Sequence, residues 1–226
     1  MKFIVTTCNE YDHLMPGFAH QFNKHWPGEK VDVLCYRKPP RLPINFNIVL
    51  LGKQPYHQVW TTPLIPYFEQ LKDELFILMM EDSWIFKDVN YTQYCVAMTL
   101  IHANKNFGRC HLHASTGIET AEHKLGFNEM LQCSDYRTSL HSSIWNREYF
   151  LKYLKPDRTC WQFEVKGMKD ARNDGALILV PNEDILTYGE IYRRGELNDG
   201  DKGFHEMSHQ DQNDLLRNVP HAVWLP

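Results

Sequence analysis

The sequence has few of the features that mark a membrane protein or a disulfide-bonded secreted protein. No apolar stretch approaches the roughly 20 residues of a spanning helix, and the N-terminus enters an apolar strand with no signal segment before it. Its six cysteines are scattered without a CxxC pair, which favours reduced thiols. We therefore expect a cytoplasmic protein, in the host cytoplasm if the chain is viral, with membrane contact only by recruitment to a surface.

A basic excess is missing as well. The 24 Lys and Arg residues against 28 Asp and Glu residues leave a formal net charge of -4, which argues against nucleic acid as a partner. The sequence also has no GxxxxGK[ST], GxGxxG or GxSxG motif. A nucleotide ligand stays compatible with this charge, because one divalent ion and one or two basic side chains can neutralise a diphosphate.

What is present is the pattern of an α/β protein. In the first half, apolar strand segments alternate with segments of helical periodicity, which implies parallel pairing, right-handed crossovers and helices on both faces of a sheet. A length of 226 residues suits one such domain. The expected strands are 2–7, 31–36, 47–51, 75–80, 110–113, 138–144 and 176–180, and the expected helices are one through Leu14, Phe18 and Phe22, then 60–72, 91–104, 146–154 and 161–169.

Paired acids give the strongest chemical signal. Glu81 and Asp82 directly follow Leu75–Met80, the most apolar run in the chain. Carboxylates at the end of a buried strand are costly unless compensated, and Mg²⁺ or Mn²⁺ is a natural partner for them. The alternative is that they mark a strand end in solvent or cap the next helix.

Two further segments suggest a ligand. The small residues Thr6 and Thr7 end the first strand and leave room for a base, on which Tyr11 could stack; the alternative is an ordinary strand-to-helix turn. Trp145 and Trp161 could form a sugar-stacking wall with Glu164 between them. The alternative for both indoles is packing of the 146–154 helix onto the sheet.

These segments together resemble the GT-A-fold nucleotide-sugar glycosyltransferases, most of all the small enzymes of bacteria and large algal viruses that build surface glycans. The resemblance covers about residues 2–197. It is carried by the Val-Thr-Thr strand end, the helix that opens on Trp60 and the paired acids after an apolar strand. Its most specific part runs from Ser139 to Glu164 and includes Ile-Trp-Asn-Arg-Glu-Tyr-Phe-Leu and Trp-Gln-Phe-Glu.

The resemblance implies a role for each candidate residue. Asp82 would bind Mn²⁺ or Mg²⁺, with Glu81 beside it contacting the donor. From the histidine spacing and not from the resemblance, His205 or His209, four residues apart, could complete the metal shell, the alternative being that neither is a ligand. Glu164 would be the general base. The metal motif of that family is usually Asp-x-Asp or a variant that ends in Asp-Asp. This chain departs from it, with Met80 at the first position and Ser83 after Asp82. The remaining implied contacts are the nucleoside pocket of Thr6, Thr7 and Tyr11, the base or phosphate contact of Arg37, and the acceptor side of Ser142, Trp145 and Trp161.

The sequence thus predicts a single GT-A-like domain over residues 1–226, with a mixed, mostly parallel central sheet and helices on both faces. Its nucleotide-binding half would be about 1–105 and its acceptor-side half about 106–226. The predicted activity is metal-assisted hexosyl or deoxyhexosyl transfer from a UDP-sugar to a glycan or other hydroxyl. The alternatives are a non-catalytic nucleotide- or glycan-binding protein of the same fold and a metal-dependent phosphohydrolase or nuclease.

Overall fold

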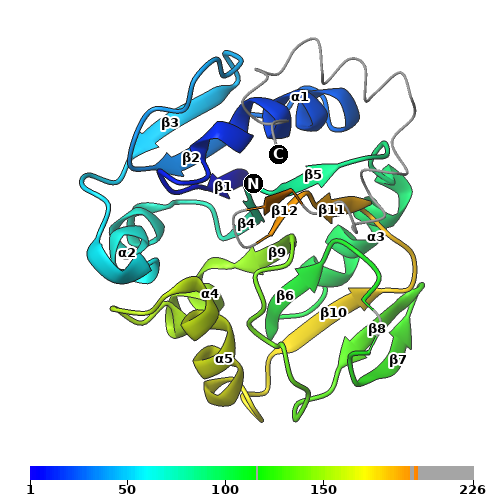
Figure 1. The fold of residues 1–226 in the computed structure, drawn as a ribbon. Helices are drawn as coiled ribbons and strands as arrows, with labels where there is room; N and C mark the ends of the chain where they lie inside the picture. The colour runs from blue at the N-terminus through cyan, green and yellow to red at the C-terminus, as the bar shows by residue number, and fades with distance from the viewer. Residues whose placement is uncertain (116, 194–195, 198–226) are drawn as a thin grey trace. The chain divides into compact units, whose positions relative to one another are not determined.

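The computed structural model describes residues 1–115, 117–193 and 196–197, and it has the mixed α/β fold that the sequence predicts (Figure 1). The chain divides into two compact units. We call one the large unit; it comprises Met1–Lys2, Leu51–Met79 and Asn90–Ile185. The other, the small unit, comprises Phe3–Leu50, Met80–Val89 and the chain from Leu186. Each unit contains residues from both predicted halves. The division into a nucleotide-binding and an acceptor-side half at about residue 105 stays a prediction.

Three parallel strands form the sheet of the small unit. β1 (Lys2–Thr6), β2 (Val31–Cys35) and β3 (Phe46–Leu50) lie in the order β3-β2-β1. Helix α1 (Met15–His25) connects β1 to β2 after the short 3-10 turn η1 (Asp12–Leu14). Its apolar side forms an aromatic core with the strands, in which the buried residues are Phe3, Phe18, Phe22, Trp26 and Phe46.

The small unit also contains short strands that the sequence did not suggest. β5 (Ser83–Ile85) follows the paired acids and pairs antiparallel with β11 (Tyr188–Glu190). β12 (Tyr192–Arg193) pairs with β13 (Glu196–Leu197). Strands of two or three residues fall below the length at which alternation of apolar and polar residues can be recognised.

The large unit contains six sheet strands, in the order β4-β9-β6-β10-β8-β7. The β6–β10 pair is parallel, whereas β4–β9, β9–β6, β10–β8 and β8–β7 are antiparallel. The fold is therefore mixed, with its regular parallel strands near the N-terminus. The bounds are β4 Leu75–Met80, β6 Phe107–His111, β7 Thr120–Lys124, β8 Phe127–Met130, β9 Ser143–Asn146 and β10 Leu177–Pro181.

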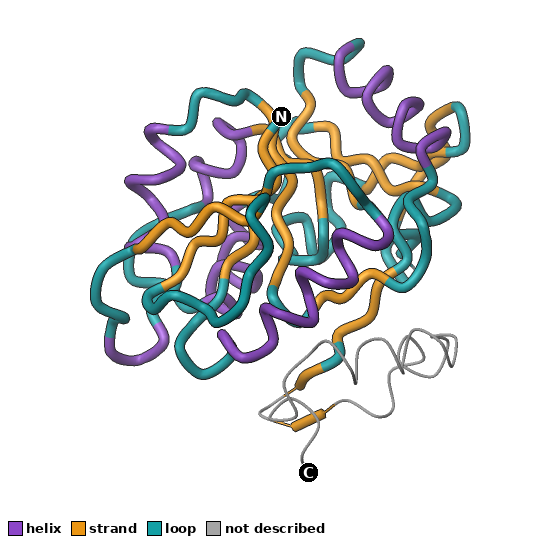
Figure 2. The backbone as a smooth tube through the Cα atoms, turned by 90° about the horizontal axis from the view of Figure 1, so that it is seen from above, coloured by secondary structure: helices purple, strands orange, loops and turns teal. Residues whose placement is uncertain are grey.

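Aromatic side chains hold the helices of the large unit on its sheet. Phe68 of α2 (Thr61–Gln70), Phe150 of α4 (Arg147–Tyr153) and Phe163 of α5 (Cys160–Asp170) meet Phe76 of β4 and Trp145 of β9. The short turn η2 (Tyr56–Gln58) precedes α2, and α3 (Tyr91–His102) leads into β6. The helices are purple and the strands orange in Figure 2.

Side-chain caps fix where three of these helices begin. The side chains of Asn90 and Asn146 accept hydrogen bonds from the backbone of the first turns of α3 and α4. Thr159 and Gln162 form a reciprocal capping box at α5. Among the described residues, no helix combines the length and the apolarity needed to cross a membrane.

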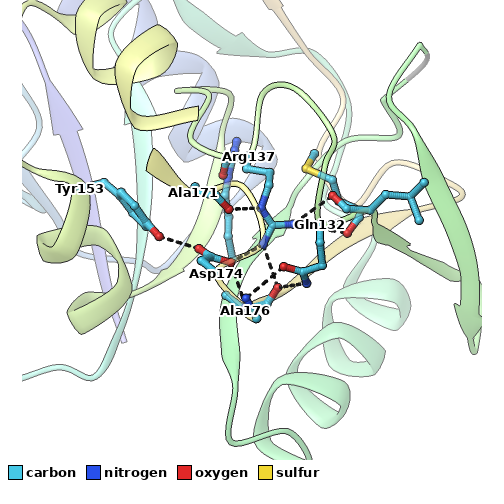
Figure 3. A network of polar contacts seen from close by, with 10 residues as sticks. Gln132, Arg137, Tyr153, Ala171, Asp174 and Ala176 are labelled. Atoms are coloured by element: carbon cyan, nitrogen blue, oxygen red, sulfur yellow. Dashed lines mark hydrogen bonds and ion pairs between the residues drawn. The ribbon is translucent and has the colours of Figure 1, made fainter. Parts of the chain in front are cut away.

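A buried ion pair anchors the irregular chain around β8 and β10 (Figure 3). Arg137 Nη2 lies 2.7 Å from Asp174 Oδ1, and both side chains are almost completely buried. Arg137 also donates to the carbonyl oxygens of Ala171 and Ala176, while Tyr153 donates to Asp174 Oδ2 at 2.6 Å. Breaking such a pair costs about 3–5 kcal/mol, because the remaining charge stays buried.

The predicted strand at 138–144 is wrong over most of its length. Residues 138–142 are irregular, and β9 begins only at Ser143. Side chains satisfy the backbone here: Glu164 accepts the amide of Leu140, and Arg109 donates to the carbonyl oxygen of His141. A backbone already satisfied in this way does not need a neighbouring strand. The strand predicted at 110–113 is shifted, since β6 spans Phe107–His111.

We predict that Gly17→Ala destabilises the small unit. A Cβ at Gly17 would overlap Cη2 and Cζ2 of the fully buried Trp84 indole. Overpacking of this kind costs about 1–3 kcal/mol, against a gain of about 1 kcal/mol in helix propensity. Urea unfolding should report a net loss. Gly17→Ala with Trp84→Phe, which removes the overlapping ring, should recover stability relative to Trp84→Phe alone; no recovery would contradict this packing.

Candidate functional site

The ends of β1 and β4 meet in the small unit. Thr6 Oγ1 donates to Met80 Sδ at 3.4 Å, and the amide of Thr7 donates to the carbonyl oxygen of Leu34 at the end of β2 at 3.0 Å. Three strand ends therefore converge, as expected for the carboxyl ends of parallel strands, where α/β proteins bind ligands. Six predicted donor-side residues belong to this unit: Thr6, Thr7, Tyr11, Arg37, Glu81 and Asp82.

Glu81 is a buried carboxylate with no compensating partner in the part of the chain that the structure describes. Its residue is 5% exposed, and no other described residue donates a hydrogen bond to its side chain or forms an ion pair with it. Burial, and then the charge of Asp82, raise the pKa of Glu81 well above its ordinary value. Burial also raises the pKa of Asp82 to about 7, with Glu190 as the next cause. Both acids thus lie where a divalent cation would relieve an electrostatic cost.

Glu190 is the residue of this site that sequence reasoning missed. It lies on β11 opposite Ser83 of β5, and the next amide, that of Ile191, donates to the carbonyl oxygen of Asp82 at 3.0 Å. A third acid therefore comes to the paired acids from more than 100 positions away along the chain. Nothing in the local sequence around Glu190 indicated this, because a three-residue strand carries no periodic signal.

Arg37 has a different first role from the predicted base or phosphate contact. Its Nε and Nη2 donate to the carboxylate of Asp12 at 2.6 and 2.9 Å, and Nη2 also donates to the carbonyl oxygen of Asn9 at 3.0 Å. Asp12 is buried, whereas the Arg37 side chain is 62% exposed. The guanidinium thus fixes the loop that carries Tyr11, and its exposed side faces solvent.

Tyr11 belongs to a small aromatic cluster. Its ring lies 5.6 Å from that of Tyr192 in an edge-to-face arrangement, and His13 lies 5.4 Å from Tyr192 in a similar one. Tyr11 and Tyr192 are both only partly buried. Nearby, burial and the charge of Glu81 raise the pKa of Cys8 to about 12, so this thiol stays protonated and is unsuited to act as a nucleophile.

The acceptor-side candidates lie in the large unit, and their surroundings differ. Trp145 is fully buried, with the Arg109 guanidinium 4.6 Å from its ring and Phe150 against it, so it has the packing role that the sequence left open. Ser142 is also fully buried. Trp161 is 59% exposed, and Glu164 is partly exposed with Oε1 accepting the amide of Leu140 at 2.7 Å.

The predicted metal ligand His205 lies outside the described residues. Within the described part of the chain, no three His, Cys, Asp or Glu side chains are grouped so that they alone could hold a metal ion. A cation at Glu81 and Asp82 would therefore need further ligands, and the diphosphate of a bound nucleotide can supply them.

A second polar cluster, of three histidines, lies in the large unit. Ser115 Oγ lies 3.2 Å from His111 Nδ1 and 3.0 Å from His113 Nε2, and the His113 and His141 rings are 4.9 Å apart. Burial lowers the pKa of all three, to about 4 for His113 and His141, and the charge of buried Arg109 contributes in each case. The cluster is therefore uncharged at neutral pH.

No protein-family model and no curated protein matches the chain. Solved structures do resemble it. S. aureus TarS 1–349 in complex with UDP-GlcNAc matches with a TM-score of 0.56 and 15% identity over 87% of this chain and 60% of that one. UDP-glucose pyrophosphorylase complexed with UDP-glucose matches with a TM-score of 0.56 and 9% identity over 96% and 98%. These likenesses concern the fold, and the chain spans about 60% of the TarS structure's length.

We predict that acid destabilises the folded chain through the histidine cluster. The unfolded chain protonates histidine near pH 6.5, whereas folded His113 and His141 do so only near 4. Between these values the unfolded state binds more protons, so stability falls as pH falls, by at most about 1.4 kcal/mol per pH unit for each histidine.

Urea unfolding from about pH 7.5 to about pH 4.5 measures this slope. His113→Asn and His141→Asn should each make it shallower, because neither variant has a ring to protonate. His102→Asn, at an exposed position, is the matched control and should leave the slope as it is. Equal slopes in all four proteins would contradict the prediction.

Proposed function

We propose that this protein is a glycosyltransferase that moves a hexosyl or deoxyhexosyl group from a UDP-sugar to a hydroxyl of a glycan or a similar acceptor, assisted by Mn²⁺ or Mg²⁺. The observation that carries the proposal is the buried carboxylate of Glu81 beside Asp82, at the point where the ends of β1 and β4 meet, with no hydrogen-bond or ion-pair partner among the described residues. A bound divalent cation would offset the cost of keeping this group charged.

Asp82 and Glu81 are suited to hold the cation. Hard divalent ions take carboxylate oxygens as ligands and retain phosphate oxygens in the same shell. A bound ion would stabilise the negative charge that develops on the departing diphosphate more than the charge of the intact donor. The position of Asp82 is fixed through its backbone, because its carbonyl oxygen accepts a hydrogen bond from the amide of Ile191.

Recognition of the nucleoside falls to the loop after β1. Thr6 and Thr7 are small, buried residues at the end of β1, and Tyr11 offers a partly exposed ring for a base. Arg37 holds this loop through Asp12 and can direct its exposed side to the donor. The two matching structures with UDP-GlcNAc and UDP-glucose support a uridine diphosphate sugar as ligand.

The proposed general base is Glu164. A base at the acceptor hydroxyl accelerates transfer by about 10²–10⁴-fold, by taking the proton as the oxygen attacks the anomeric carbon. The hydrogen bond from the Leu140 amide orients the carboxylate through Oε1. The exposed indole of Trp161, three residues earlier on α5, is a stacking surface for an acceptor sugar.

We predict that Asp82→Asn abolishes the metal-dependent part of UDP binding. Titration calorimetry with UDP should show the loss in Mn²⁺, by about tenfold or more, and little change in EDTA, because the amide keeps the size of the side chain but not its charge. Asp88→Asn in the same unit, at a side chain 86% exposed, is the control. Equal Mn²⁺ dependence in Asp82→Asn and the unaltered chain would refute the assignment.

Glu164→Gln tests the base. The glutamine carbonyl can still accept the Leu140 amide, so the 138–142 loop should persist while proton transfer is lost. We predict a fall in kcat of about 10²-fold or more with donor affinity retained. Glu148→Gln, at an exposed position on α4, is the matched control. A change confined to donor affinity would show that Glu164 is not the base.

Product analysis separates this activity from its alternatives. Release of UDP from UDP-glucose or UDP-GlcNAc, with sugar appearing on an acceptor, supports glycosyl transfer. Formation of UTP from UDP-glucose and pyrophosphate would instead indicate nucleotidyl transfer, the reaction named for one of the matching structures. Tight UDP binding without turnover on any acceptor would favour the non-catalytic binding protein.

A further inference from the structure

The segment from Thr187 to Tyr192 lies beside the candidate donor site, and its backbone is paired or hydrogen-bonded with residues 82–86 from Thr187 to Ile191. The amide of Phe86 donates to the carbonyl oxygen of Thr187 at 3.0 Å, β11 pairs with β5, and the amide of Ile191 donates to the carbonyl oxygen of Asp82 at 3.0 Å. The backbone of this segment is therefore held on the same short stretch that carries the paired acids. We call it the donor strap.

Alternation along the donor strap decides which side chains reach the site. Ile191 lies between β11 and β12, and burial alternates across it: Gly189 and Ile191 are buried, whereas Glu190 and Tyr192 are partly exposed. Ile191 is 1% exposed and belongs to the core, whereas Tyr192 is partly exposed. Burial of Ile191 thus fixes the outward direction of its two neighbours.

The two outward side chains meet different parts of the site. Tyr192 lies against Tyr11 at 5.6 Å and against His13 at 5.4 Å, both edge-to-face. Glu190 lies opposite Ser83 and acts on the charge of Asp82. Their Cα atoms are about 7 Å apart along an extended strand, which is comparable with the span of a ribose between a base and its phosphates.

An edge-to-face pair is a suitable start for a base site. In such a pair the edge of one ring meets the face of the other, and a third aromatic group can add to the pair by stacking or edge-to-face contact. A pyrimidine base is planar and stacks on tyrosine, a contact that affects binding by about 1–3 kcal/mol per base. Tyr11 and Tyr192 come from segments far apart in the chain, and because their rings are in contact, one base can touch both of them.

We propose that Tyr192 is a recognition residue for the uracil base of the donor, forming the base site together with Tyr11, and that Glu190 on the same strap sets the negative charge at the diphosphate end. The inference rests on the proposed function and deepens it. One strap thereby links recognition of the base to binding of the cation, because both side chains depend on the same backbone anchor at Asp82.

Tyr192 is tested by a series at one position, with calorimetry of UDP binding in EDTA. Tyr192→Phe keeps the ring and should bind within about twofold of the unaltered chain, whereas Tyr192→Leu keeps apolar bulk without a ring and should lose about tenfold or more. Saturation-transfer NMR should show a weaker signal at uracil H5 and H6 in Tyr192→Leu. Competition by pyrophosphate, which has no base, should be equal in all three.

Glu190→Gln tests the other end of the strap. Removing one negative charge near the diphosphate should leave UDP affinity in EDTA equal or higher, while the gain in affinity on adding Mn²⁺ should shrink by about tenfold. The opposite signs in the two conditions distinguish a charge effect from general damage to the strap, which would lower both affinities.

The outcomes separate this inference from the proposed function. If the unaltered chain binds no UDP with or without Mn²⁺, both fall. If it binds UDP and Tyr192→Leu binds as well as Tyr192→Phe, the aromatic site is refuted while the donor site stands. If Tyr192→Leu loses as much free energy of unfolding as free energy of UDP binding, Tyr192 likewise has a structural role only.

Discussion

Burial of like charges at the end of β4 is the constraint on which the candidate site depends. Glu81 and Asp82 lie next to each other after an apolar strand, and Glu190 reaches them from β11. The raised pKa values of Glu81 and Asp82 express the cost of desolvation first and then of repulsion by a neighbouring acid. An arrangement of this kind lowers stability unless a cation or a protonated state offsets it, which is why we propose these acids as a binding site.

In the large unit, the buried positive charges of two arginine side chains have partners within the protein. Arg137 has Asp174 and four backbone carbonyl groups around it, and Arg109 has serine hydroxyls, carbonyl groups and the Trp145 ring. These contacts hold irregular backbone in place without strand pairing. Burial, and to a lesser extent the positive charge of Arg109, lower the pKa of the neighbouring His111, His113 and His141. Glu81 differs from these arginines, since none of the described residues forms a hydrogen bond or ion pair with its carboxylate.

Sequence reasoning succeeded where a single segment carries its own signal. Leu75–Met80 was predicted with its observed bounds because six consecutive apolar residues can only be a buried element, and the helices capped by Asn90, Asn146 and Thr159 begin within one residue of expectation. It failed where the signal is divided between segments. It also missed the β7–β8 hairpin. This hairpin turns on Leu125 and Gly126, both at positive φ, and of these two residues only glycine is typical of such a turn.

The sequence by itself determined the α/β class, the parallel strands near the N-terminus and the position of the paired acids at a strand end, because periodicity and local composition encode these features. Only the tertiary structure decided which residues accompany those acids. It brought Glu190 and Tyr192 to the candidate donor site, turned Arg37 to Asp12, and placed Trp145 under Arg109 in the core. The physical reason is that these contacts join segments of unrelated sequence, and the register of a short strand pair that unites them is set by burial and not by any local pattern.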